Sequence, residues 1–178
     1  MRLFSKIADI WRHEELRNKI GITLGLILVY RIGSFIVLPG VNPDALSATT
    51  SGLGGLLALF TGGAFTRASI FALGIMPYIS ASIIIQLLTG VSDYFKNLKE
   101  QGEVGRKQIT QLTRYGTVFI AILQGYGVSV GLENAGSLVL EPGMSFRLTT
   151  TISLVAGTTF LMWLGEQITL RGVGNGIS

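Results

Sequence analysis

The chain offers few side chains that could carry out chemistry. Its 178 residues include no cysteine and a single histidine, His13, which stands among charged residues near the N-terminus. Without cysteine there is no disulfide and no thiolate nucleophile. The sequence also shows no carboxylate pair in an apolar setting, no phosphate-binding loop and no metal-ligand spacing. We therefore disfavour an enzyme and expect no catalytic residue, metal site or cofactor, with His13 as a solvated or interfacial residue.

Polar side chains do occur inside an uncharged apolar run of 21 residues, 68–88. The run carries Ser82 and Gln86, and Gly74 and Pro77 lie in its first half. Proline removes a backbone donor, so a helix is expected to kink at this point. Broken helices line pores and binding sites in membrane proteins, although serine on a kinked helix also serves ordinary helix packing. The residues favour a pore or transporter and leave the packing interpretation open.

The composition places this run in a membrane protein. Hydrophobic residues make up 48% of the chain and charged residues only 13%, against about 25% charged in soluble domains. The mean hydropathy is +0.55. A net charge of +4 could indicate a nucleic-acid partner, but the basic residues flank apolar runs, which is where membrane topology places them. We expect an all-α membrane protein with no specific nucleic-acid site.

Four uncharged or nearly uncharged runs predict transmembrane helices, because about 20 apolar residues cross a bilayer. They cover residues 20–38, 68–88, 115–132 and 148–165. Arg31 lies within the first run, and we expect it to be paired inside the bundle rather than to serve transport, since a charge facing lipid is costly. Residues 1–19 predict an amphipathic helix on the membrane surface, or equally an exposed helix that precedes the first span.

A shorter apolar segment lies between the first two spans, at residues 53–67. Its apolar part, Leu53 to Phe60, is too short to cross about 30 Å at about 1.5 Å per residue. Glycine pairs bracket it on both sides. Such a segment is tolerated at membrane depth only when it is buried in protein or lines a water-filled cavity. We expect a re-entrant element rather than a span.

The distribution of basic residues predicts the orientation. Of 14 lysines and arginines, 11 precede the first span, lie in the loop 91–114 or follow the fourth span, and only Arg67 and Arg147 fall on the other side. Cytoplasmic loops carry an excess of lysine and arginine. We therefore expect the N-terminus, the loop 91–114 and residues 166–178 to be cytoplasmic.

Two long motifs carry a resemblance to a known family. "FALGIMPYISASIIIQLL" (71–88) and "MWLGEQITLRGVGNGIS" (162–178) are similar to the two signatures of the SecY family, the channel subunit of the Sec protein translocon. "FTGGAFTRASI" and "EQGEVGRKQITQLTRYGT" fit the bacterial form. The resemblance implies the N-terminal part of a ten-helix fold, with four transmembrane helices and a short re-entrant plug helix. It places the chain in the bacterial plasma membrane.

The resemblance also implies a function and partners. The family forms a passive protein-conducting channel that moves unfolded preproteins across the plasma membrane and releases transmembrane segments into it. The implied partners are the small subunits SecE and SecG, the motor ATPase SecA, the ribosome, signal sequences and nascent chains, and membrane lipids. The charge of the loop 91–114 is equally explained by topology and lipid contact.

Four groups of residues follow from the resemblance. Ile75 and Ile79 match a pore ring, although the residues alone favour plain core contacts. The lateral-gate candidates are Ser82, Gln86 and Gln124. The resemblance also implies that the cytoplasmic end of the fourth span is held together by Glu166 and Arg171. The plug is implied at Leu53, Gly54, Gly55, Leu56, Leu57, Ala58, Leu59, Phe60, Thr61, Gly62, Gly63, Ala64 and Phe65.

Two other classes of membrane protein remain as alternatives. A secondary transporter or a small-solute channel would also contain broken helices. It would be expected to carry coupling ligands near the midplane, and the predicted spans contain no acidic residue. An assembly or anchoring protein would not require the short segment at 53–67.

Overall fold

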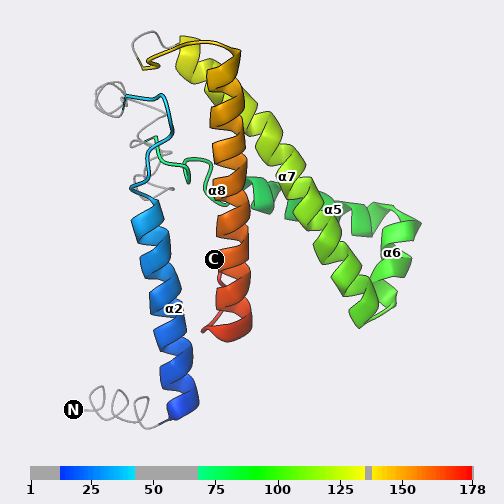
Figure 1. The fold of residues 1–178 in the computed structure, drawn as a ribbon. Coiled ribbons are helices and arrows are strands. Elements are labelled where there is room, and N and C mark those ends of the chain that lie inside the picture. Colours follow the sequence, from blue (N-terminus) through cyan, green and yellow to red (C-terminus); the bar gives the residue numbers. More distant parts are fainter. Residues whose placement is uncertain (1–12, 43–67, 135–137, 178) are drawn as a thin grey trace, which may run out of the picture.

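The computed structural model describes residues 13–42, 68–134 and 138–177 (Figure 1). The described part is helical and contains no β-strand beyond two isolated bridges, which confirms the expected all-α class. The plug residues 53–65 and most of the N-terminal helix expected at 1–19 lie outside the described residues. The helices are α2 (Glu14–Gly33), α5 (Met76–Val91), α6 (Asp93–Glu100), α7 (Glu103–Asn134) and α8 (Met144–Arg171).

Helices α7 and α8 form the central pair, joined by a short connection at the top of Figure 1. Small side chains of α7 are buried at four-residue spacing, at Thr113, Thr117, Ala121, Gly125 and Ser129. Residues four apart lie on one face of a helix. Small residues at such a face allow the close approach that stabilises helix pairs in a bilayer. The face of α8 against it includes Leu154, which is fully buried.

Three non-helical segments meet at one end of this pair: residues 34–42, 68–75 and 138–143. Isolated bridges join Val37 to Ser69 and Val41 to Val139. The amide of Leu38 donates to the carbonyl oxygen of Ala68 at 2.7 Å, and the amide of Ile70 donates to that of Ile36 at 3.0 Å. These bonds satisfy backbone groups that the helices do not, which is required wherever lipid replaces water.

The apolar core lies at this junction. Its buried members come from all three segments and from the adjoining ends of the helices: Leu38, Val41, Ala68, Ala72, Leu138, Val139, Phe146 and Leu154. The segment 68–75 is therefore held by both backbone pairing and apolar burial. It forms a rigid connection to the start of α5 rather than part of a continuous helix.

The run predicted to span at 68–88 is helical only from Met76 onward. Ala68 and Gly74 have positive φ values of 46° and 58°, which end any helix through this segment. Pro77 lies in the first turn of α5, where its missing amide hydrogen would have had no helical partner. The expected kink at Pro77 is therefore wrong, because proline begins this helix instead of bending it.

The helices at the other end of the molecule extend beyond the predicted spans. Residues 91–114, expected as a polar loop, contain α6 and the first turns of α7. The two are packed closely, because a Cβ at Gly105 would overlap the carbonyl oxygen of Leu98. After α8 the chain turns back: the amide of Val173 donates to Oγ1 of Thr23 at 3.0 Å.

Arg31 near the end of α2 is exposed, whereas the sequence predicted that it would lie inside the bundle. Its guanidinium carbon lies 5.4 Å from the centroid of the Phe35 ring. Arginine over an aromatic face is a favourable arrangement that tolerates partial loss of water. Among the described residues, α2 packs against α8 and the segment 68–75.

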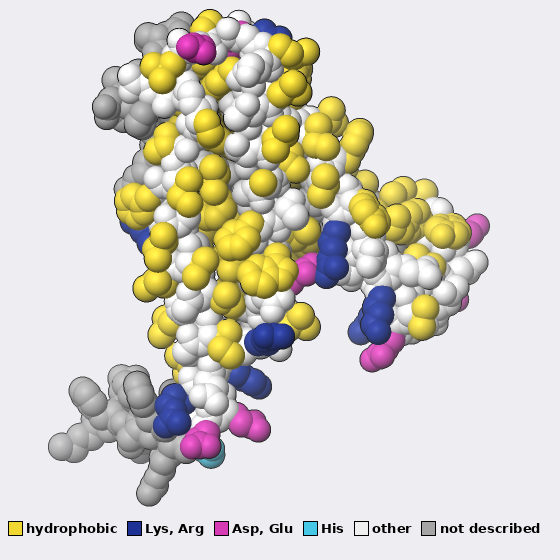
Figure 2. Space-filling view, viewed as in Figure 1, with side chains coloured by type: hydrophobic (Ala, Val, Ile, Leu, Met, Phe, Trp, Pro, Cys, Tyr) yellow, Lys and Arg dark blue, Asp and Glu magenta, His cyan; other side chains and the backbone are white. Residues whose placement is uncertain are grey.

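Apolar side chains cover much of the exposed face of this body (Figure 2). Leu28, Phe119 and Ile152 are 60%, 64% and 66% exposed, one on each of α2, α7 and α8. Among the described residues, α7 and α8 are long and apolar enough to cross a membrane, and α5 is a shorter apolar helix. Exposure of large apolar side chains on several helices is expected where lipid or further protein covers them.

Candidate functional site

Ile75 and Ile79 lie where the segment 68–75 passes into α5. Ile75 is the N-cap residue, and its carbonyl oxygen accepts hydrogen bonds from the amides of Tyr78 and Ile79, both at 3.1 Å. The two isoleucines are therefore one helical turn apart and lie on the same side of α5. Ile75 is half-buried and Ile79 is 38% exposed, so neither is a fully buried core contact.

Ile75 also lines an apolar cavity of about 320 Å³ between α2 and α8. The walls come from Leu26 and Tyr30 of α2, from Leu161 and Leu164 of α8, and from Ile177, where the chain turns back along α8. Isoleucine is stiff at its first side-chain torsion and makes no hydrogen bonds. The side chain of Ile75 therefore offers this cavity a stiff apolar surface that binds no polar group.

The lateral-gate candidates are brought together only in part. The Nε2 atom of Gln86 donates to Oγ of Ser82 at 3.3 Å, one turn away on α5. Gln124 lies on the exposed surface of α7, and within the described residues no hydrogen bond joins it to either. Gln86 is exposed as well. The Ser82–Gln86 bond shields polar atoms along an otherwise apolar helix.

An ion pair joins α7 to α8 at the end near α5. Arg114 donates from Nε to Oε1 of Glu166 at 2.9 Å and from a terminal nitrogen to Oε2 at 2.7 Å. This bidentate arrangement is the strongest geometry that arginine and carboxylate form. Glu166 thus joins α8 to α7 through Arg114, a partner that the sequence did not indicate.

A second ion pair joins the same helices at the opposite end. Arg147 of α8 and Glu133 of α7 form a hydrogen-bonded pair at 2.5 Å. Arg114 and Glu133 are 19 positions apart on α7, and Arg147 and Glu166 are 19 positions apart on α8. At about 1.5 Å per residue the two pairs are separated by roughly 28 Å, close to the thickness of a hydrocarbon core. No charged residue lies between them on either helix.

A stack of aromatic rings connects α2, the segment 68–75 and α8. The Phe71 ring lies between Tyr30 and Phe160, with centroid distances of 5.8 Å and 6.0 Å and interplanar angles of 13° and 9°. Trp163 continues the stack at 5.8 Å from Phe160. Sequence reasoning missed this stack, because its members come from distant parts of the chain.

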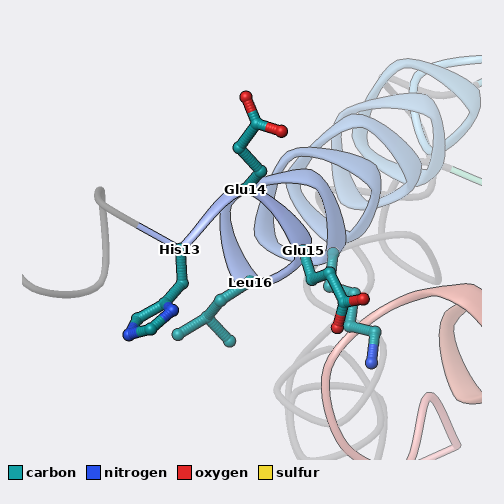
Figure 3. Close-up of a pocket in the computed structure, with 5 residues that line it drawn as sticks. His13, Glu14, Glu15 and Leu16 are labelled. Carbon is teal, nitrogen blue, oxygen red and sulfur yellow. The ribbon is translucent and has the colours of Figure 1, made fainter.

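A cavity at the start of α2 brings together no distant parts of the described chain (Figure 3). It is lined by His13, Glu14, Glu15, Leu16 and Lys19, which all come from one short stretch of helix. The labelled side chains of His13, Glu14 and Glu15 point away from one another in Figure 3. Within residues 13–42, 68–134 and 138–177, no group of three or more His, Asp or Glu side chains could hold a metal ion.

The helical fold, its spans and its exposed apolar faces define a multi-pass helical membrane protein. The SecY family matches residues 69–178, and the chain belongs to that family. "Protein translocase subunit SecY" of Escherichia coli strain K12 is 52% identical over 92% of this chain and 39% of its own length. The protein of the same name from Buchnera aphidicola is 52% identical over 92% of this chain and 48% of its own length.

Solved structures share the fold at low identity. The chain matches "The structure of a protein conducting channel" with a TM-score of 0.62, 19% identity, and coverage of 90% of this chain and 34% of that one. It matches "The plug domain of the SecY protein stablizes the closed state of the translocation channel and maintains a membrane seal" with a TM-score of 0.61, 21% identity, and coverage of 90% and 33%. This chain spans less than half the length of these relatives.

Proposed function

We propose that the chain forms the N-terminal part of the central subunit of a bacterial protein-conducting channel. The observation that supports this most is the placement of Ile75 at the end of a non-helical segment, beside an apolar cavity between α2 and α8, with Ile79 one helical turn further along α5. Relatives named protein translocase subunit SecY support the channel assignment. The channel would move unfolded preproteins across the plasma membrane and release transmembrane segments into it.

Ile75 and Ile79 supply part of a constriction in this proposal. Apolar side chains surround an extended polypeptide without binding any of its groups, so the polypeptide can slide through. An empty apolar constriction also loses water and so resists ions. The stiffness of isoleucine keeps such a collar narrow. Energy for transport would come from partners, since the proposed site carries no catalytic group.

The proposed topology has four spans formed by α2, by the segment 68–75 together with α5, and by α7 and α8. The N-terminus, the α6 region and residues 166–178 face the cytoplasm, which is supported by the excess of basic residues on that side. The Arg114–Glu166 pair then lies near the cytoplasmic interface and the Glu133–Arg147 pair near the outer one. The helix α5, of 16 residues, reaches only about 24 Å, so the segment 68–75 must supply the remaining depth.

The proposed partners are the small subunits SecE and SecG, the motor ATPase SecA, the ribosome, arriving signal sequences and nascent chains, and lipids. One structural neighbour is "Sec61 in the Canine ribosome-channel complex from the endoplasmic reticulum". The exposed apolar faces of α2, α7 and α8 are available for lipid and small subunits. The basic α6–α7 region is available for cytoplasmic partners, with Lys96, Lys99 and Lys107 at its surface.

Replacing Gln86 or Gln124 with leucine should change how hydrophobic a signal sequence must be. Polar contacts across a helix seam are worth about 0.6–2 kcal/mol each, which an arriving apolar helix can match. The measurement is export of reporters with graded signal hydrophobicity by the complete channel. An unchanged threshold would remove that residue from the gate. Because only Gln86 is bonded to Ser82, Gln86→Leu and Gln124→Leu are tested separately.

Deleting residues 55–63 from the complete channel should leave export possible and make the resting channel leak ions. This prediction rests on the sequence, which places a short apolar segment with glycines on both sides at 53–67. A stopper needs hinges and modest local stability. The measurement is conductance of the closed channel in planar bilayers. An unchanged conductance would contradict the assignment of a plug to this segment.

A transporter or small-solute channel is the alternative class. Reconstitution of the complete channel with its motor into vesicles separates the two. The proposal predicts that a preprotein becomes protected from external protease on addition of ATP, without saturable uptake of small solutes. Saturable solute uptake without preprotein protection would support the alternative. The described part of α7 and α8 holds no acidic residue between its two ion pairs, which disfavours proton coupling there.

A further inference from the structure

The aromatic stack around Phe71 lies directly before the proposed constriction in the chain. Phe71 is 2% exposed and lies four residues before Ile75. Its two ring neighbours come from α2 and α8, the helices that also wall the cavity beside Ile75. Phe71 therefore attaches the segment 68–75, which leads to Ile75, to α2 and α8.

Two glycines make room for this attachment. A Cβ at Gly33 of α2 would overlap the Phe71 ring, and a Cβ at Gly157 of α8 would overlap the carbonyl oxygen of Ile70 and lie 3.2 Å from Cδ1 of Phe71. Both helices thus approach the Phe71 segment as closely as backbone allows. Close approach on both sides leaves the ring little freedom to shift.

Hydrogen bonds connect the backbone at Phe71 to that at Ile75, so the placement of the Phe71 ring affects the placement of Ile75. The amide of Phe71 donates to Oγ of Ser69 at 3.1 Å, and the amide of Gly74 donates to the carbonyl oxygen of Phe71 at 2.8 Å. Gly74 adopts a positive φ of 58°, which closes the turn directly before Ile75. Ile75 then begins α5 by accepting from Ile79. Phe71 and Ile79 are thus connected through turns and helix rather than through a loose linker.

We propose that Phe71 is a positioning residue for the constriction: its ring, held between Tyr30 and Phe160, determines where Ile75 and Ile79 lie relative to α2 and α8. This inference rests on the proposed function, since it assigns a role to the stack only if the two isoleucines bound the pore. The stack acts through the backbone and does not contact the translocating chain.

The test measures one distance near the constriction and one away from it in the complete channel. Spin labels at Met76 and Ile152 measure the distance between α5 and α8. Labels at Ile122 and Ile152 measure the distance between α7 and α8. All three side chains are exposed. Phe71→Leu should broaden the first distance distribution about twofold and leave the second unchanged. Resting ion conductance should rise about tenfold. The loss of stacked aromatic pairs shifts the equilibrium between a constriction held in position and a displaced one by roughly that factor.

Matched variants distinguish a specific role of Phe71 in positioning the constriction from a general loosening of the helix packing. Phe119→Leu removes an exposed ring of α7 outside the stack, 64% exposed, and should change neither readout. Phe160→Leu should reproduce the effect of Phe71→Leu, because it removes the other ring of the same contact. Phe160→Tyr keeps the ring, which is 39% exposed and has room for a hydroxyl, and should behave as the unmodified chain. The Phe160 pair of variants decides the question if Phe71→Leu does not assemble.

Three results would overturn the inference: no change on Phe71→Leu, equal broadening of both distance distributions, or equal effects of Phe160→Leu and Phe160→Tyr. Crosslinking of a stalled secretory chain to positions 75 and 79 in the unmodified channel separates this failure from that of the proposed function. If those crosslinks form and Phe71→Leu has no effect, only the role of Phe71 is wrong. If they do not form, the constriction itself is misassigned.

Discussion

Replacing Gly157 with alanine should lower the free energy of unfolding of the channel by about 2 kcal/mol. A Cβ at this position would overlap the Ile70 carbonyl oxygen and crowd the Phe71 ring. Overpacking a well-filled site costs about 1–3 kcal/mol, and the upper part of that range applies because backbone, not a flexible side-chain end, is in the way. Alanine recovers up to about 1 kcal/mol of helix propensity, which reduces the net loss.

The measurement is thermal or denaturant unfolding of the purified channel in detergent, followed by tryptophan fluorescence. Gly127→Ala is the matched control, because Gly127 lies inside α7 and a Cβ added there would meet no neighbouring atom within 4 Å. This control should leave the midpoint unchanged or raise it slightly. Equal midpoints for Gly157→Ala and Gly127→Ala would show that α8 does not approach the Ile70–Phe71 segment as closely as described.

Replacing Glu166 with glutamine should destabilise the α7–α8 pair by about 2 kcal/mol. The substitution leaves the Arg114 guanidinium without its carboxylate, and breaking a buried hydrogen-bonded pair costs about 2–5 kcal/mol. The lower end applies because the Arg114 side chain is 43% exposed, although that of Glu166 is only 18% exposed. The same unfolding measurement applies, with the transition expected to move to lower temperature.

Two further variants show that the pairing, rather than either side chain, carries this effect. The exchange Arg114→Glu with Glu166→Arg should recover most of the lost stability. Glu14→Gln is the control, because Glu14 and Arg17 form an exposed pair at 3.8 Å, and such pairs contribute little. If Glu14→Gln and Glu166→Gln had the same effect, the Arg114–Glu166 pair would have no structural role.

The long helices could be predicted from sequence because local composition determines them. The uncharged runs at 115–132 and 148–165 lie inside α7 and α8, and the charges that flank them mark where the apolar stretch ends. The helices then continue beyond these runs on both sides. Polar residues continue a helix as readily as apolar ones, so hydropathy locates a span but not the ends of its helix.

The segment before α5 could not be predicted in the same way. Residues 68–75 are as apolar as the helix that follows, and a short apolar run does not distinguish helix from extended chain. The deciding features are long-range: the bridge from Ser69 to Val37 and the burial of Ala72 in one core with Leu138 and Phe146. Proline and glycine signalled an interruption correctly, but the sequence placed it as a kink within a helix rather than as the start of one.

The contacts that organise the candidate site are also long-range. Arg114 and Glu166 are 52 positions apart, and the stack joins Tyr30, Phe71 and Phe160 across three segments. Neither leaves a periodic signal in the sequence. One usable signal did exist: two uncharged runs of equal length, each flanked by one basic and one acidic residue, which match when the helices run antiparallel.

Site-specific crosslinking of a stalled secretory chain tests most directly whether Ile75 and Ile79 bound the path of a polypeptide. A photoreactive residue is placed at position 75 or 79 of the complete channel, or at Ile152, which is 66% exposed on α8 and serves as the control. Both positions 75 and 79 should form adducts with the stalled chain, and position 152 should form none. Absence of adducts at 75 and 79, with a chain shown to be stalled in the channel, would contradict the assignment of these isoleucines to the pore.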